Sequence, residues 1–130
     1  NVGGNEYSNA IMMGHVRSIR WDANGWPLVM PERYGAVPQV PITEEEIAGN
    51  WEHLSLTSST STQRTSETLT FDAGTHKISS GSWKDASWTF DAASQTITTS
   101  AGVVLYLQRE VDWEATPRTH THRLRPRTRK

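Results

Sequence analysis

Short runs of alternating hydrophobic and polar residues, separated by turn residues, fill this chain between residues 42 and 114. The first run, from Trp51 to Leu56, alternates as a strand that places Trp51 and His53 on the same side. Asp, Ala, Gly, Ser and Thr residues form the predicted turns between the later strands, which are expected at 68–71, 77–83, 87–90, 96–99 and 103–111. No long segment has helical periodicity. The pattern predicts an all-β fold, either a small antiparallel barrel or a sandwich.

Two segments of this region have a distinct pattern. Residues 103–107 are apolar on both faces, which predicts a central strand. At the end of this predicted strand and just beyond it, Glu110, Asp112 and Glu114 alternate with apolar residues and are expected to form one polar face. The Ser/Thr run at 57–66 is predicted to be a mobile hairpin loop.

One very short helix is expected just before the first strand of this region. Thr43 fits the N-cap position, and Glu46 lies three residues later, where it completes a capping box. Acidic residues fill the first turn, where the positive end of the helix dipole favours them. Gly49 is expected to end the helix.

Near the start of the chain, a β-hairpin is expected. Val16, Ile19 and Trp21 are spaced as strand residues, the turn lies at 22–25, and Trp26 opens the return strand. The prolines at positions 27 and 31 prevent the return from continuing as a helix or as a central strand.

Changes in composition divide the chain into four parts. These are the hairpin and its exit at 1–35, a proline-punctuated linker at 36–41, the β-rich domain at 42–116 and a basic tail at 117–130. The tail lacks alternating apolar positions, so it is either a genuine basic arm or the product of a shifted reading frame. The first residues form no basic and apolar leader and include no initiator Met, as expected of a processed or excised piece.

Charge and cysteine content narrow the possible partners. All 14 acidic residues lie at or before Glu114, together with seven of the 13 basic ones, and the other six basic residues lie within 118–130. Because the body is acidic, nucleic acid is disfavoured as a partner, and only the tail suits a phosphate backbone. The absence of cysteine excludes disulfides and thiolate zinc sites. No membrane partner is predicted, since no stretch approaches the ~20 apolar residues of a membrane span.

Residues 25–35 read Gly-Trp-Pro-Leu-Val-Met-Pro-Glu-Arg-Tyr-Gly, and this run resembles the end of the five-bladed propeller in arabinanase-like enzymes of glycoside hydrolase family 43. The resemblance implies that residues 1–35 are the terminal strands of a propeller-like catalytic domain. It also implies that residues 25–35 are a structural exit that carries no chemistry itself. It rests on seven signature positions: Gly25, Trp26, Pro27, Pro31, Glu32, Arg33 and Tyr34.

A second resemblance agrees with the first. Gly49 and Trp51 form the Gly-x-Trp motif that opens the first strand of lipocalin-like barrels, where the Trp plugs the closed end. The small barrel that follows the propeller in arabinanase-like enzymes often starts in a similar way. The run from Val111 to Glu114 also resembles that family, and the resemblance ends after Pro117.

The resemblance implies that this chain is a non-catalytic accessory part of an enzyme that cleaves α-1,5-arabinan or a related plant polysaccharide. The family's catalytic carboxylates lie in earlier propeller blades, so the chain alone is expected to be inactive. The expected partners are the catalytic propeller of the same enzyme and plant cell-wall polysaccharide, in an extracellular or periplasmic location. No cofactor is assigned to this chain, and the resemblance allows a metal ion in the intact enzyme.

The aromatic and histidine side chains supply the candidate binding residues. Trp83 and Trp88 are candidate substrate-binding residues because sugar C–H faces pack on indole rings, and packing in the core is the competing interpretation. His120 and His122 alternate on an extended segment but have no third metal ligand nearby, so no metal site is predicted. His15 is expected to make a backbone hydrogen bond.

The carboxylates of the β-rich region give no sign of a catalytic pair. Asp72, Asp85 and Asp91 lie in predicted turns, where local bonds to the backbone explain them. Two alternatives to the accessory role stay open: an independent carbohydrate-binding module, and a lipocalin-like carrier of a small apolar ligand. A carrier needs an open cavity, whereas a barrel with strands this short is often packed solid.

Overall fold

The computed structural model of the chain describes residues 14–55 and 65–112. These residues form two compact units that divide between Ala36 and Val37, inside the predicted linker. The predicted loop at 57–66 lies almost wholly outside the described residues, and the basic tail lies entirely outside them.

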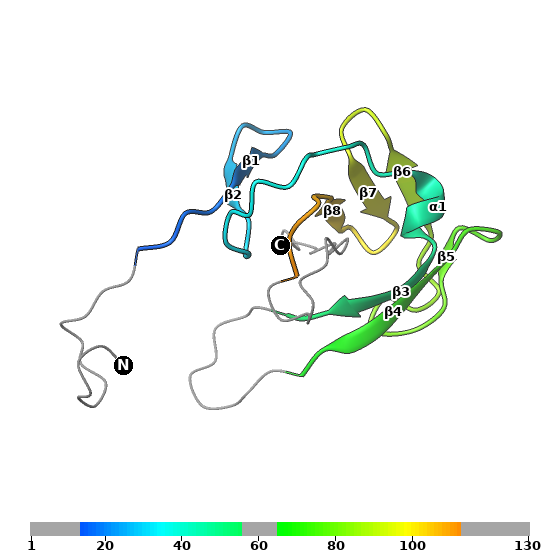
Figure 1. The fold of residues 1–130 in the computed structure, drawn as a ribbon. Helices are drawn as coiled ribbons and strands as arrows, with labels where there is room; N and C mark the ends of the chain where they lie inside the picture. The colour runs from blue at the N-terminus through cyan, green and yellow to red at the C-terminus, as the bar shows by residue number, and fades with distance from the viewer. Residues whose placement is uncertain (1–13, 56–64, 113–130) are drawn as a thin grey trace, which may run out of the picture. The chain divides into compact units, whose positions relative to one another are not determined.

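The first unit is built on a two-stranded antiparallel sheet of β1 (Ile19–Trp21) and β2 (Pro27–Val29), shown in blue in Figure 1. Ile19 pairs with Val29, and Trp21 pairs with Pro27. Pro27 is tolerated because it is the first residue of its strand, where a missing N–H costs little. The predicted hairpin is confirmed.

The described residues of the second unit form one helix and two three-stranded antiparallel sheets, ordered β3-β4-β5 and β6-β7-β8 (Figure 1). Its elements are α1 (Glu44–Ile47), β3 (Gly49–His53), β4 (Glu67–Asp72), β5 (Lys77–Ile78), β6 (Trp88–Asp91), β7 (Thr96–Thr99) and β8 (Val104–Tyr106). Every strand pairs with its neighbour in the sequence, as short β-runs joined by tight turns should. The predicted all-β, antiparallel fold is confirmed.

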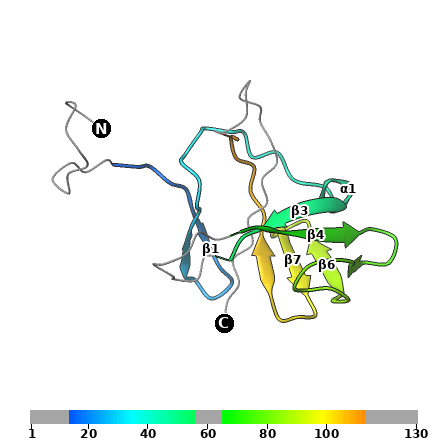
Figure 2. The ribbon, with the colours of Figure 1, turned by 90° about the horizontal axis from the view of Figure 1, so that it is seen from below.

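The two sheets are joined into one meander. An isolated bridge pairs Lys77 with Ser87. The N–H of Ile78 donates to the carbonyl of Ala86 at 2.9 Å, and the N–H of Trp88 donates to that of His76 at 2.9 Å. Figure 2 shows β3 and β4 crossing β6 and β7, so the meander folds one sheet over the other. Within residues 37–55 and 65–112, β3 and β8 pair on one side only, so the described strands do not close a barrel.

The hydrophobic core of the second unit lies around Trp88, whose side chain is 1% exposed. The edge of the Phe71 ring meets the Trp88 ring, with centroids 5.7 Å apart and planes at 71°. Each buried apolar side chain of this size stabilises the fold by about 1.5–3 kcal/mol. The other buried members of the cluster are Ile42, Ile47, Leu69, Ile78, Ile97, Val103, Leu105 and Leu107.

Helix α1 begins as the sequence predicts and ends one residue earlier than expected. The Glu46 carboxylate accepts the N–H of Thr43 at 2.8 Å, which is the capping-box contact. The helix ends at Ile47, and Ala48 is the extended C-cap. Gly49, expected to end the helix, instead opens β3 with a φ of +126°, a backbone conformation that favours glycine.

The predicted linker is bonded to the far end of the second unit. The Gln39 side-chain amide donates to the carbonyl of Arg109 at 2.9 Å, and its amide oxygen accepts the N–H of Arg109 at 3.1 Å. Gln95 makes a similar pair of bonds to the backbone N–H and C=O of Ile42, at 2.7 and 3.1 Å. Residues 37–42 are therefore held by side-chain amides that replace a strand ladder.

The strand expected at 77–83 is wrong beyond Ile78, because the chain turns there. The N–H of Asp85 donates to the carbonyl of Ile78 at 2.8 Å, and the N–H of Lys84 donates to the carbonyl of Gly81 at 3.1 Å. Gly81 adopts a φ of +82°, which breaks the strand geometry.

The strand expected at 103–111 is also shorter than predicted, since β8 covers only three residues. It was expected to be central, but β7 lies between β6 and β8 in the described sheet. A run of apolar residues indicates burial on both faces but does not identify the middle strand. Glu110 was expected on a polar strand face and is instead buried, outside any strand.

Candidate functional site

The turn of the β1–β2 hairpin is held by one side chain. The Asp22 carboxylate accepts the backbone N–H of Asn24 at 2.8 Å and that of Trp26 at 2.9 Å. Gly25 takes a φ of +79° and donates its N–H to the carbonyl of Asp22 at 3.0 Å. An Asx turn followed by a left-handed glycine therefore aligns the two strands.

The hairpin presents an apolar face, which we call the hairpin face, made of Ile19, Trp21, Pro27 and Val29. Strand alternation and the pairing register place these four residues on the same side of the sheet. All four are exposed, with Trp21 at 66% and Val29 at 54%. Soluble proteins seldom leave such contiguous apolar groups uncovered, so the hairpin face has the character of an interaction surface.

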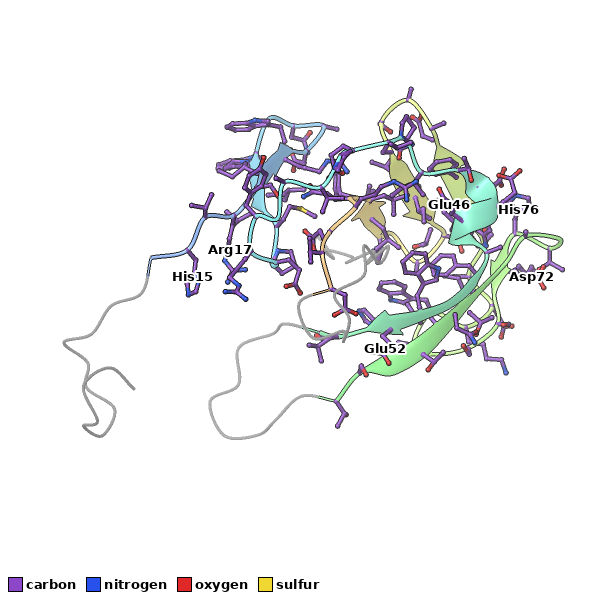
Figure 3. All side chains as sticks on the ribbon, in the orientation of Figure 1. His15, Arg17, Glu46, Glu52, Asp72 and His76 are labelled. Carbon is purple, nitrogen blue, oxygen red and sulfur yellow. The ribbon has the colours of Figure 1, made fainter. Side chains whose placement is uncertain are left out.

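The signature residues of the exit continue the hairpin without adding a chemical site. The N–H of Tyr34 donates to the carbonyl of Val16 at 2.8 Å, and the N–H of Met30 donates to the backbone carbonyl of Ser18 at 2.9 Å. Pro31 and Glu32 are half-buried, whereas the Trp26 and Tyr34 side chains are exposed. His15 and Arg17, both labelled in Figure 3, are exposed on the segment that leads into β1.

A second feature lies on the sheet of the second unit, where His53, Glu67 and Trp83 form what we call the His53 cluster. His53 on β3 faces Glu67 on β4 in the strand register, and its Nδ1 lies 2.7 Å from Glu67 Oε1. The imidazole packs on the Trp83 indole, with ring centroids 4.6 Å apart and planes at 40°. Three residue types typical of binding sites thus meet where two adjacent strands pair.

Glu67 is the charged member of this cluster and has two donors. The second carboxylate oxygen accepts the backbone N–H of Ser82 at 3.1 Å. Hydrogen bonding from Ser82, and then from His53, holds the pKa of the Glu67 carboxyl below its usual value. Because an ionised carboxylate only accepts hydrogen bonds, Nδ1 of His53 must carry the proton that is shared with Glu67.

The segment after β5 lies on β4 and delivers Trp83 to the cluster. The Ser80 hydroxyl donates to the carbonyl of Thr68 at 3.0 Å, and the N–H of Ser79 donates to that of Thr70 at 2.9 Å. A Cβ at Gly81 would stand 2.3 Å from Leu69 Cδ2, so only glycine allows this close approach.

The two tryptophans predicted as candidate substrate-binding residues lie in different environments. Trp83 is partly exposed. Trp88 is covered by Phe71 on one side and by His76, whose ring centroid lies 4.8 Å away. A sugar needs an accessible ring face, so the geometry favours Trp83 over Trp88 as the candidate.

A second histidine–carboxylate pair lies at the opposite end of the β3–β4 ribbon. His76 Nε2 lies 2.6 Å from Glu44 Oε1, and Figure 3 shows His76 beside α1. Both side chains are about half exposed. This pair attaches the β4–β5 turn to the helix.

Two of the three predicted turn carboxylates, Asp72 and Asp91, bond to the backbone of their turns as expected. Asp72 accepts the N–H of Thr75 at 2.8 Å, and Asp91 accepts that of Ala93 at 2.9 Å. Backbone hydrogen bonds, chiefly from Thr75 and Ser94 respectively, hold the pKa values of both carboxyls below their usual range.

Residues 14–55 and 65–112 contain no group of three or more His, Asp or Glu side chains placed to hold a metal ion. The His120 and His122 pair lies outside these ranges. The same two ranges include no helix with the length and hydropathy that crossing a bilayer requires.

Sequence reasoning missed the His53–Glu67 contact. The alternating pattern predicts His53 on the Trp51 side of its strand, as the structure shows, but the predicted strand at 68–71 does not include Glu67. The signal for it is the alternation of Glu67, Leu69 and Phe71 on one face of β4, which extends the strand by one residue.

Comparison with known proteins identifies the family of the chain. A family model described as the C-terminal lipocalin-like domain of glycoside hydrolase family 43 (GH43_C) matches residues 31–123. The match begins inside the exit signature and runs past Pro117, where the sequence resemblance was expected to end. Searches among curated proteins and solved structures returned no match. Since the match covers most of the chain, and since the described part of it is antiparallel β-structure, the chain belongs to the family of lipocalin-like C-terminal domains of glycoside hydrolase family 43.

Proposed function

We propose that this chain is the non-catalytic C-terminal accessory part of a family 43 enzyme that acts on α-1,5-arabinan or a related plant polysaccharide. In this role it braces the catalytic propeller of the same enzyme. The family membership supports a position beside a glycoside hydrolase catalytic domain. The arabinanase assignment rests on the exit signature between Gly25 and Tyr34.

The exposed hairpin face is the observation that carries the bracing role. It consists of apolar side chains on a two-stranded sheet, and two strands alone are marginally stable in water. Further strands of a propeller blade would cover these side chains and stabilise the hairpin. The hairpin face is therefore the surface through which this chain packs against the rest of the catalytic propeller.

The accessory role also bears on the cofactor, the location and the carrier alternative. We assign no cofactor to this part of the enzyme and place any metal ion with the catalytic domain. An extracellular or periplasmic location suits an enzyme whose polymeric substrate lies outside the cell. A carrier function is disfavoured because the Trp88 side chain and its neighbours occupy the core of the second unit.

A pair of matched substitutions in the intact enzyme tests the bracing role. Val29 on the hairpin face and Val40 in the second unit are both exposed, at 54% and 62%. Val29→Asp should lower the melting temperature of the intact enzyme and its rate of arabinan hydrolysis, because it buries a carboxylate in the interface. Val40→Asp should change neither. Equal effects of the two substitutions would contradict the proposal.

Activity of the isolated chain provides a second test. The purified 130-residue chain is expected to release no reducing sugar from linear arabinan, whereas the intact enzyme does. Turnover by the isolated chain that persists after repurification would contradict the non-catalytic assignment.

A further inference from the structure

We propose that the His53 cluster is a subsite for a neutral saccharide on the accessory domain. The proposal rests on the proposed function for its choice of sugar, a segment of plant polysaccharide. It assigns the residues and the mode of contact, and it adds a substrate-holding role to the bracing role.

The contacts of His53 hold its ring ready for a ligand. The Glu67 carboxylate lies 2.7 Å from Nδ1 and fixes the proton on that nitrogen, and the Trp83 indole packs against the imidazole ring. Among the described residues, no hydrogen bond reaches the other ring nitrogen, Nε2. The His53 side chain retains 12% exposure, and with the proton held on Nδ1 by Glu67 the neutral ring offers Nε2 as a hydrogen-bond acceptor.

The surrounding groups select the class of ligand. An anion is disfavoured because the ionised Glu67 carboxylate is part of the cluster. A resident metal ion is disfavoured because the described residues supply fewer than three suitable ligands in one place. A neutral sugar has an apolar C–H face for the partly exposed Trp83 indole and a hydroxyl for Nε2 of His53.

The cluster is also rigid, which favours binding of a weak ligand. His53 and Glu67 are fixed by the register of β3 and β4, and the close packing of Gly81 on Leu69 fixes the approach of Trp83. Little side-chain entropy is then lost when a ligand binds. Glu52, labelled on β3 in Figure 3, is the exposed neighbour of His53 and points to the other face of the strand.

Affinity electrophoresis of the 130-residue chain in gels containing linear α-1,5-arabinan tests the proposal, with arabinoxylan gels as a second probe. The wild type should be retarded by at least one of the two polymers. Trp83→Ala and His53→Ala should each weaken the retardation by about tenfold or more, because each removes one of two principal contacts. Trp26→Ala, an exposed tryptophan of the first unit, is the matched control and should bind as the wild type does.

Each outcome of the electrophoresis either supports or overturns the subsite. The proposal is overturned if neither polymer retards the wild type, or if both cluster variants bind as tightly as the control. If Trp83→Ala shows no cooperative thermal unfolding, His53→Gln decides in its place: loss of binding supports the subsite and unchanged binding contradicts it. The Val29 and Val40 variants report docking in the intact enzyme, so failure of the subsite and failure of the bracing role are distinguishable.

Discussion

The guanidinium of Arg109 meets both carboxylate oxygens of Glu46, which lies 63 residues earlier in the chain. Arg109 Nη2 is 2.9 Å from one oxygen and 3.1 Å from the other. The same side chain donates from Nε to the carbonyl of Val40 at 2.7 Å. A single arginine therefore ties the capping residue of α1 and the preceding segment to the chain that follows β8.

Replacing Arg109 by Met should destabilise the protein. The side chain is largely buried, and its removal takes the guanidinium donors away from the Val40 carbonyl and the Glu46 carboxylate, which costs about 1–3 kcal/mol. Urea unfolding followed by far-UV circular dichroism measures the free energy of unfolding. Lys84→Met, at an exposed position, should change it by less than about 0.5 kcal/mol. Equal losses in the two variants would show that the Arg109 contacts contribute nothing.

Alanine at Gly81 should be more harmful than alanine at Gly102. The two glycines have nearly the same φ, +82° and +81°, so the backbone penalty is shared. A Cβ at Gly81 would meet Leu69 Cδ2 at 2.3 Å, whereas nothing lies within 4 Å of one at Gly102. Gly102→Ala should cost about 1 kcal/mol, and Gly81→Ala should cost about 1–3 kcal/mol more. Thermal unfolding of both variants measures the difference, and equal losses would contradict the packing of this loop on β4.

The Glu67 carboxylate should make the free energy of unfolding depend on pH in the acid range. Hydrogen bonds from Ser82 and His53 lower its folded-state pKa below the usual value of 4.5, so folding favours the ionised form. This contribution is present above pH 4.5 and is lost as the pH falls through the lower folded-state pKa. The effect is modest because the side chain is about one-third exposed.

Urea unfolding at pH 7 and pH 3 checks this dependence. Glu67→Gln should lose less stability between the two values than the wild type. Some acid dependence should remain in the variant, because Asp72 and Asp91 also have lowered pKa values. Glu52→Gln, which removes an exposed carboxylate on β3, is the control and should behave as the wild type does. A Glu67→Gln profile that parallels the wild type would be evidence against the cluster's hydrogen bonds.

Trp51 should act through its indole N–H as well as through packing. Its Nε1 donates to the carbonyl of Ile47 at 2.7 Å, at the C-terminal end of α1, where helix carbonyls lack intrahelical partners. Trp51→Phe should therefore lower the free energy of unfolding by about 1 kcal/mol more than the loss of buried ring area explains. Helix-end protection measured by amide hydrogen exchange at Ala48 and Gly49 should fall in this variant, and unchanged protection would argue against the contact.

The sequence was sufficient to predict most of the local elements. Asp22 with Gly25, Thr43 with Glu46, and Asp91 with its turn partners each combine a side-chain acceptor with a nearby backbone donor. Such contacts span only two to four residues, so residue type and spacing determine them. The strand at Thr96–Thr99 followed from alternation between two such turns.

The features that the sequence could not predict depend on contacts between residues that lie far apart in the sequence. The Glu67 partner of His53 follows from strand register across a 14-residue separation. The short β5 follows from packing of Gly81 on Leu69, which the alternating pattern at 77–83 does not reveal. The bonds of Gln39 and Arg109, 70 residues apart, likewise leave no periodic signal.

Hydroxyl-radical footprinting of Trp21 and Trp26 tests the central claim most directly, by comparing the isolated 130-residue chain with the intact enzyme. Both side chains are exposed, at 66% and 63%, so both should be oxidised readily in the isolated chain. If the catalytic propeller docks on the hairpin face, Trp21 should be strongly protected in the intact enzyme. Oxidation of Trp21 at the same rate in both forms would contradict the bracing role.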